Sequence, residues 1–155
     1  MNVGLVFGII FAVIVIGFIL FFGIKYMGEM SETACKSQAG QQISNLEKAV
    51  KSTLALSQGS SQELRVILPN CYERICFVDT EHPESYPEGG WEPDERTKMM
   101  TYQEKKNVFL FKPNGVVEGW RIEKLKPHIN FCMTSTKKVI LRNTGSLVEI
   151  ALPGF

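Results

Sequence analysis

The stretch NVGLVFGIIFAVIVIGFILFFGI, residues 2–24, has no charged side chain and decides how the chain is organised. Because an α-helix rises about 1.5 Å per residue, this stretch would extend through roughly 35 Å, slightly more than the hydrocarbon thickness of a bilayer. The alternative is a buried core helix, but so small a domain does not need such a long, uniformly apolar helix. The sequence therefore predicts a hydrophobic transmembrane helix over residues 1–24.

The apolar stretch lacks the parts of a secretory signal peptide. Such a peptide has a basic n-region, an apolar stretch of about 7–15 residues and a small-residue cleavage site, and none of these fits. We therefore expect the stretch to belong to the working protein. Charge divides the chain at the same place, because all 17 Lys and Arg and all 16 Asp and Glu lie from Lys25 onward. The net charge of +1 gives no reason to expect a nucleic-acid partner.

Residues 25–60 contain no proline and continue the helical pattern in amphipathic form. Apolar residues recur there mostly in steps of three and four, at Met27, Met30, Ala34, Ile43, Leu46, Val50 and Leu54. We expect one helix from about residue 3 to residue 57, with Gly23 or Gly28 as the place of any bend. The Ser-Gln-Gly-Ser-Ser sequence at 57–61 supplies the end of this helix.

Residues 61–155 change to short β-branched and aromatic runs, which are typical of strands. The predicted strands are LRVIL (64–68), RICFV (74–78), NVFLF (107–111), VVEGWRIE (116–123), INFCMT (129–134), KKVILR (137–142) and SLVEIAL (146–152). Pro113-Asn114-Gly115 and Asn143-Thr144-Gly145 are predicted turns of antiparallel hairpins. A parallel sheet would need helical crossovers, and none is expected after Ser57. The predicted fold class is α+β: a long N-terminal hydrophobic helix followed by an antiparallel β-sheet head.

A long acidic loop is predicted over residues 80–106. Residues 79–95 contain seven acidic residues and no Lys or Arg, whereas residues 96–155 are basic on balance. The acidic spacing matches no known calcium loop such as the EF-hand, so a solvated or partner-facing loop is favoured over a calcium site. Tyr86, Trp91 and Tyr102 indicate that this segment packs onto something, if only onto the sheet.

Four cysteines, Cys35, Cys71, Cys76 and Cys132, lie in the hydrophilic part and indicate disulfides in an oxidising exterior. Cys35 lies about 33 Å back along the helix from residue 57, and Cys71 lies about 30 Å along an extended chain from residue 62. If the first strand runs back along the helix, the two cysteines therefore lie side by side. We predict the pairs Cys35–Cys71 and Cys76–Cys132, with Cys71–Cys76 and Cys35–Cys132 as the main alternative. A zinc site is a rival, but no second compact cysteine pair accompanies Cys71 and Cys76.

Gly4, Gly8 and Ala12 follow one another at four-residue intervals and form a smooth stripe on one helical face. Such stripes let helices approach closely, so the apolar helix is expected to pack against other helices through this stripe. Chance spacing is the alternative, because glycine is common in membrane helices.

The layout of the whole chain resembles that of type IV pilins and pilin-like proteins of archaea. The similarity lies in GLVFGIIFAVIVIGFILFFG, in Cys35 on the helix, and in LPNCYERICFVD and NFCMTS. It implies a precursor whose short basic leader is removed by a prepilin peptidase, and an assembly ATPase that drives subunits from the membrane into a helical homopolymer. It also implies an extracellular filament at the cell surface. Leu5 departs from the glutamate of many bacterial pilins, which archaeal relatives often lack.

The resemblance implies a filament core built from the apolar helices of many copies. The acidic segment 79–95 of one subunit and the basic sheet region of another offer a second, electrostatic contact between subunits. A single-pass anchored protein whose β domain serves as a subunit or binding module of a membrane complex is the alternative. An enzyme is not expected, because there is no Gly-rich phosphate loop, no clustered metal ligands and no evident Ser-His-Asp pattern. His82 is expected in a loop and His128 at the start of a strand. We predict no catalytic residue, no cofactor and no metal.

Overall fold

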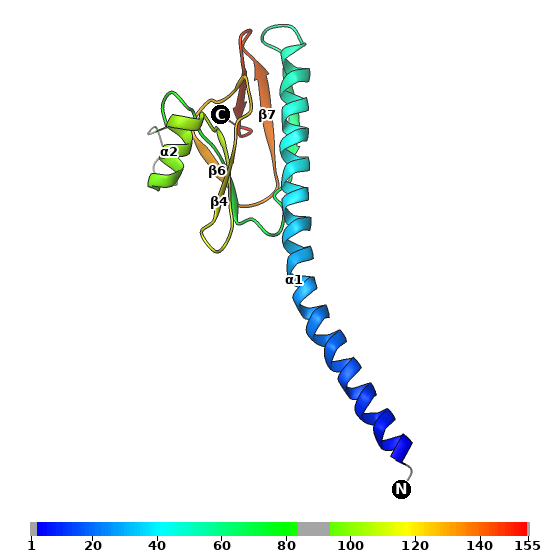
Figure 1. The fold of residues 1–155 in the computed structure, drawn as a ribbon. Coiled ribbons are helices and arrows are strands. Elements are labelled where there is room, and N and C mark those ends of the chain that lie inside the picture. Colours follow the sequence, from blue (N-terminus) through cyan, green and yellow to red (C-terminus); the bar gives the residue numbers. More distant parts are fainter. Residues whose placement is uncertain (1–2, 84–93, 155) are drawn as a thin grey trace. The chain divides into compact units, whose positions relative to one another are not determined.

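A computed structural model of the chain describes residues 3–83 and 94–154. The chain divides into two compact units, Met1–Ser37 and Gln38–Phe155. Helix α1 (Val3–Leu54) belongs to both units, and its last turns form part of the second (Figure 1). The class is α+β, since an N-terminal apolar helix precedes a second helix and two β-sheets.

The part of α1 inside the second unit is amphipathic, as the sequence predicts. Its buried residues recur in steps of three and four and are Ala39, Ile43, Leu46, Ala49, Val50 and Thr53. The positive charge of Lys51 in the last turn stabilises the helix by interacting with the negative end of the helix dipole. The helix ends at Leu54, three residues before the predicted end, and Gly59 in the following turn has a φ of 86°.

The first sheet, sheet A, has the strand order β1-β7-β8-β5. Its strands are β1 (Ser61–Val66), β5 (Leu125–Pro127), β7 (Lys137–Asn143) and β8 (Val148–Ala151). The prediction of a wholly antiparallel head is wrong here, because β5 pairs with β8 in parallel. No helical crossover is needed, since β6 and β7 lie between these two strands in the sequence. The sequence pattern missed β5, which is three residues long and ends in proline.

The second sheet, sheet B, is antiparallel and has the strand order β4-β3-β2-β6. Its strands are β2 (Arg74–Phe77), β3 (Val108–Phe111), β4 (Val117–Trp120) and β6 (Phe131–Met133). All seven predicted strands therefore exist, with shifted ends. Both predicted hairpins are confirmed, because β3 pairs with β4 and β7 with β8, with Gly115 and Gly145 at φ values of 78° and 104°.

Helix α2 (Glu95–Glu104) lies where the sequence predicted the end of a long acidic loop. Asp94 caps the helix by accepting a hydrogen bond from the backbone N–H of Thr97 at 2.9 Å, and Lys105 ends it in the left-handed conformation. The prediction missed this helix because the segment is strongly polar and buries only Thr97, Met100 and Thr101. Residues 84–93, including Tyr86 and Trp91, lie outside the described residues.

Each sheet buries one apolar layer against a helix. On sheet B, Met100 of α2 packs against a cluster of buried side chains, which are Cys76, Val78, Phe109, Phe111 and Val117. On sheet A, the side chain of Asn143 contacts α1, so the face that carries Asn143 is the one that packs on this helix. Alternation along the strands places four fully buried side chains on the same face, which are Val139, Leu141, Val148 and Ile150. In Figure 1, α2 and the last turns of α1 lie on opposite sides of the strands.

Gly119 of β4 leaves room for an aromatic ring. A Cβ at this position would lie 2.9 Å from Phe109 Cε1 and 2.9 Å from Lys106 Cδ. Phe109 is the direct partner of Gly119 across the β3–β4 pair and is fully buried. The glycine therefore serves ring packing, because it makes space for the buried Phe109.

Asn143 on β7 fastens the end of α1 to sheet A. Its Nδ2 group lies 3.2, 3.3 and 2.8 Å from the carbonyl oxygens of Thr53, Leu54 and Leu56. Its Oδ1 atom accepts a hydrogen bond from the backbone N–H of Gly145 at 2.7 Å. The buried Asn143 amide thus contacts carbonyls at the end of α1 and in the turn after it, where a helix lacks its own donors, although the Thr53 carbonyl also accepts from the N–H of Leu56 at 3.1 Å.

We predict that Asn143→Ala lowers the free energy of unfolding by about 2–3 kcal/mol, because it removes the hydrogen bonds from the Asn143 amide to the end of α1 and the one from the Gly145 N–H. Denaturant unfolding of the full chain in detergent, followed by tryptophan fluorescence, measures the change. Asn45→Ala, on an exposed turn of α1, is the matched control and should stay within about 0.5 kcal/mol of the wild type. Equal stability of the two variants would contradict the assigned role of Asn143.

Candidate functional site: an unburied apolar helix and a cross-linked head

The apolar part of α1, Val6–Gly23, is not buried by any of the residues that the structure describes. None of its 18 residues is buried, and Phe7, Phe11 and Phe21 are 75%, 68% and 69% exposed. The segment is therefore not the core helix of a domain formed by this chain. At 1.5 Å per residue it is about 27 Å long, close to the hydrocarbon thickness of a bilayer. It has the length and composition of a membrane-spanning segment or of a signal sequence.

The predicted stripe on this helix is open along its length. A Cβ added at Gly4 or Gly8 would meet no atom within 4 Å, and Ala12 is exposed. Gly17 is equally open and, at 100° per residue, lies on the side of the helix opposite Gly8. Among the described residues, nothing therefore packs against these small residues.

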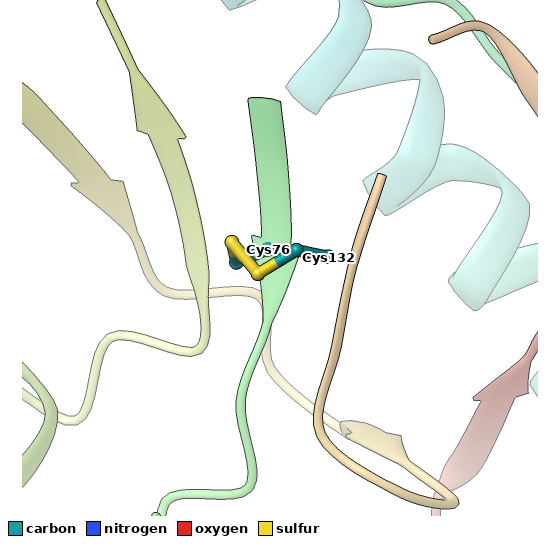
Figure 2. The surroundings of a disulfide bond; sticks show 2 residues. All are labelled: Cys76 and Cys132. Atoms are coloured by element: carbon teal, nitrogen blue, oxygen red, sulfur yellow. A yellow bond between two sulfur atoms is a disulfide. The ribbon is translucent and has the colours of Figure 1, made fainter. Parts of the chain in front are cut away.

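Cys76 and Cys132 form a disulfide between β2 and β6, as the sequence predicts (Figure 2). They are direct partners in the antiparallel register, with their Cα atoms 4.0 Å apart. This bond excludes the alternative pairing of Cys71 with Cys76. Cys35 and Cys71 are disulfide-bonded as well, and none of the four cysteines is free. The Cys35–Cys71 pair itself stays a prediction.

The Cys76–Cys132 bond closes a long loop and stiffens sheet B. The two residues are 56 positions apart, and cross-links of this span typically stabilise by about 4 kcal/mol. Cys76 is completely buried in the cluster under α2, so the bond is shielded from solution thiols. Disulfides of this kind fit an extracellular or other oxidising location.

One group of side chains in the head has metal-ligand spacing. Asp79, Glu81 and His82 each offer a ligand atom within 4.8 Å of the others, and no other such group occurs in residues 3–83 and 94–154. Lys126 on β5 already supplies a cation there, because its Nζ atom lies 3.1 Å from Asp79 Oδ2 and 2.7 Å from Glu81 Oε2. The group is explained as an ion-pair anchor, and we assign no metal to it.

Asn130 completes this anchor. Its Oδ1 atom accepts a hydrogen bond from the backbone N–H of Asp79 at 2.6 Å, and its Nδ2 group donates to the carbonyl of His82 at 3.0 Å. Partial burial alone would raise the pKa of Asp79, but hydrogen bonds from Glu81 N–H and the Lys126 ammonium outweigh burial and hold this pKa below its ordinary value. The start of the acidic segment is therefore fixed to β5.

The two histidines lie near carboxylates at the surface. His82 is in the loop after β2, as predicted, and its Nδ1 atom lies 3.3 Å from Asp79 Oδ2. His128 follows β5 and so does not start a strand, contrary to the prediction, and its Nδ1 atom lies 2.9 Å from Glu149 Oε1. Neither pair is deeply buried, because the imidazoles are 73% and 52% exposed.

Three buried asparagines hold loops in place, and the sequence pattern did not predict this role. Besides Asn130 and Asn143, Asn107 donates to the carbonyls of Ile122 and Leu125 at 2.9 and 2.8 Å and accepts from the N–H of Ile122 at 2.8 Å. Asn107 and Asn130 lie inside stretches predicted as strands, and Asn143 lies in a predicted turn. The predicted secondary structure therefore already accounted for an asparagine at each position, and nothing pointed to a buried hydrogen-bonding role. The polar core of the head is therefore structural.

Comparison with known proteins gives no relative from which a role could be transferred. No protein-family model matches the chain, and neither the curated proteins nor the solved structures contain a significant match. Only the geometry of the chain itself bears on its function.

We predict that Asp79→Asn destabilises the head at pH 7 by about 0.5–1.5 kcal/mol, because the ion pair with Lys126 is lost. Since the folded pKa of Asp79 lies below the unfolded value of about 3.9, its stabilisation is complete above that value and disappears as the pH falls through the folded pKa. The wild type and the variant should therefore converge in urea unfolding as the pH is lowered through the folded pKa of Asp79.

The matched control is Glu63→Gln, because Glu63 also pairs with a lysine, Lys138 at 2.8 Å, but both side chains are more than half exposed. An exposed pair contributes little, so this variant should follow the wild type at every pH. A constant difference between wild type and Asp79→Asn from pH 7 through the folded pKa of Asp79 would contradict the ionic explanation.

Proposed function

We propose that the chain is a structural subunit of an extracellular filament of the type IV pilus class, which polymerises through its N-terminal hydrophobic helix. The observation that carries this proposal is the complete exposure of Val6–Gly23 on a chain whose other unit has its own core. So much apolar surface needs a bilayer or copies of the same helix around it.

Assembly in this proposal is an exchange between two apolar environments. Subunits wait in the membrane through the apolar helix, and the same side chains later pack on one another in the filament. The hydrophobic free energy, about 25 cal/mol per Å² of apolar surface, largely cancels in this transfer because neither environment is water. Close packing and contacts between heads must then favour the filament, as they do for helix association in lipid.

The small-residue stripe and the cross-linked head support the same proposal. Gly4 and Gly8 are open in the single chain, so neighbouring helices find a smooth surface at these positions. The head is held by disulfides and by two sheets, each packed on a helix, which suits a domain exposed outside the cell. The proposal assigns the chain a structural role and no catalytic one.

The partners follow from the proposal. They are further copies of the chain in a helical homopolymer, the membrane before assembly, a prepilin peptidase that trims a leader, and an assembly ATPase. Nucleic acid is not among them, since the net charge is only +1. Archaeal pilin-like proteins remain the class with the proposed layout.

A second candidate is a single-pass anchored protein whose β head is a subunit or binding module of a membrane complex. The observation that favours it is the length of Val6–Gly23, which as one helix matches the thickness of a single bilayer. In this case the apolar helix would stay surrounded by lipid, and the chain would remain in the membrane fraction.

The proposed function predicts that the chain is found in filaments sheared from the surface of the producing cells. Electron microscopy of the sheared material, with mass spectrometry of its peptides, tests polymer and leader removal together. We expect helical filaments in which the first mature residue lies just before or within the start of the apolar stretch. Recovery of the chain only from membranes, as single copies with lipid around the helix, would contradict the proposal and favour the second candidate.

Gly8→Leu should leave membrane insertion intact and lower filament yield at least about tenfold. The added side chain meets no atom of its own chain, so the only contacts it disturbs are those with neighbouring helices. Filament yield, measured by shearing and immunoblotting and normalised to the membrane-inserted pool, gives the effect.

The matched control is Gly17→Leu, which adds the same side chain to the same apolar helix on the opposite side. It should assemble at close to the wild-type level if the stripe of Gly4, Gly8 and Ala12 is the contact surface. Equal yields for both variants, whether high or low, would count against a stripe-specific contact.

A further inference from the structure

Strand β1 is an open edge of sheet A. It pairs with β7 on one side, and no other strand in residues 3–83 and 94–154 pairs with it. The opposite edge strand, β5, is blocked by Pro127 and by the Asn107 amide, which donates to the carbonyl of Leu125 at 2.8 Å. An open edge of six residues, such as β1, is a template to which a further strand can add.

The β1–β7 ladder shows which backbone groups of β1 point to the open edge. The N–H of Asn143 donates to the carbonyl of Ser60 at 2.9 Å, so the paired residues Ser61 and Arg142 make no hydrogen bonds to each other. Alternation then directs the backbone N–H and C=O groups of every second residue of β1 to the open edge, which are those of Ser61, Glu63 and Arg65.

The side chains along this edge are accessible. Glu63 and Arg65 are exposed on the outer face of sheet A, away from α1, and Ile67, directly after the strand, is 47% exposed. On the inner face, Leu64 is only partly buried, whereas Val139 beside it on β7 is completely buried. The stretch of α1 that packs on the inner face therefore leaves the β1 edge partly uncovered.

The charges of β1 make the strand complementary to itself. Within its own sheet, Arg65 lies directly opposite Lys138, and like charges in such a pair are destabilising. If two copies of β1 pair antiparallel about Leu64, Glu63 of each copy lies opposite Arg65 of the other. These two attractive pairs would use the backbone groups that point to the open edge, and Leu64 would meet its own copy on the inner face.

The existing partner of Glu63 does not prevent this pairing. Its carboxylate lies 2.8 Å from the ammonium of Lys138, but both side chains are more than half exposed, so the carboxylate can accept a second cation. Other antiparallel registers are worse. Centring the pair on Glu63 or on Arg65 would place that residue opposite its own copy, with like charges face to face.

We propose that β1 is a self-pairing edge, to which β1 of a second copy of the chain adds antiparallel with Leu64 at the centre. The two copies of sheet A then form one continuous sheet. Such a contact is isologous, because the same surface serves both copies. It goes beyond the proposed function and does not depend on it.

The pairing fixes the relative direction of the two copies. Within one head, β1 runs antiparallel to the end of α1, because Asn143, which donates to Ser60, also donates to the carbonyl of Leu56, whereas Gln62 reaches back to the carbonyl of Ala49. Antiparallel pairing of β1 therefore points the last turns of α1 in opposite directions in the two copies. Subunits of one filament share one direction, so the contact joins heads of two filaments or of two anchored chains that face each other.

The experiment uses the full chain in detergent with the substitution Leu64→Cys. In the proposed register, residue 64 faces its own copy in a pair without mutual hydrogen bonds, where Cα atoms are about 4.5 Å apart. Cys76 and Cys132 show that such a position suits a disulfide, since their Cα atoms are 4.0 Å apart. Mild oxidation with copper phenanthroline should give a dimer on a non-reducing gel, linked from residue 64 to residue 64 in peptide mapping.

The matched control is Ser61→Cys, which places a thiol at an exposed position on the same strand. In the proposed register, residue 61 lies opposite residue 67 of the other copy, so the two copies of residue 61 are about 20 Å apart. We expect at least about tenfold less linked dimer from Ser61→Cys than from Leu64→Cys. Equal yields, or no linked dimer from Leu64→Cys, would overturn the proposal.

Charge reversal in the Leu64→Cys chain tests the register. Glu63→Arg or Arg65→Glu alone brings like charges opposite each other, so each should lower the dimer yield about tenfold. Mixing these two variants, one of them ¹⁵N-labelled, should restore the yield as mixed-isotope dimers. Glu123→Arg reverses an exposed carboxylate outside β1 and should leave the yield unchanged.

An unchanged yield in Glu63→Arg and Arg65→Glu, or a mixture that restores nothing, would also overturn the proposal. The proposed function is tested separately, by filaments on cells. Filaments without a Leu64→Cys dimer would refute the self-pairing edge alone. A dimer linked through residue 64, from a chain that forms no filaments, would refute the proposed function and keep the self-pairing edge.

Discussion

The head depends on the packing of one amphipathic helical stretch against sheet A. Ile43, Leu46 and Val50 are at most 8% exposed, and burial of three such side chains contributes roughly 5–8 kcal/mol. The same helix continues into Val6–Gly23, where no residue is buried. A single helix therefore serves two environments: one stretch covers a sheet with one face, and the other is apolar all around. The stretch of α1 that stabilises the head is therefore continuous with the stretch that carries the proposed role.

Polar contacts decide how the head closes around this apolar packing. Asn143 joins the end of α1 to β7, Asn107 fastens the chain around Ile122, and Asn130 with Lys126 fixes the start of the acidic segment. Each of these amides is almost fully buried and has its hydrogen bonds satisfied inside the chain. The disulfide between Cys76 and Cys132 adds a covalent link within sheet B. A domain held together in this way suits an oxidising location outside the cell, which the proposed function requires.

The surfaces left free agree with a subunit that associates with its own copies. The apolar helix offers a smooth stripe of small residues, and sheet A offers an exposed face that carries Arg65, Lys138 and Arg142. Apolar packing supplies little direction in a lipid-like environment, whereas paired charges on a rigid sheet define an orientation. A filament needs both, because its subunits must adhere and must also repeat with one rotation and one rise.

The sequence by itself determined the features that depend on local pattern. The apolar stretch, the amphipathic continuation with Ile43, Leu46 and Val50, the seven strands and both glycine-containing hairpins follow from periodicity and turn chemistry, and these are properties of neighbouring residues. The Cys76–Cys132 bond was predicted only as the pair that remains once the distance comparison joins Cys35 to Cys71.

Only the tertiary structure decided the features that depend on distant partners. Strand β5 exists because β8 pairs with it in parallel, and α2 is stable because Met100 enters a cluster on sheet B, although its own sequence is mostly polar. Asn143 gained its role from carbonyls almost ninety residues away, and Arg65 meets Lys138 only across the β1–β7 pair. The physical reason is that hydrogen bonds, cross-strand charges and burial belong to pairs of segments brought together by folding, so no single stretch of sequence contains them.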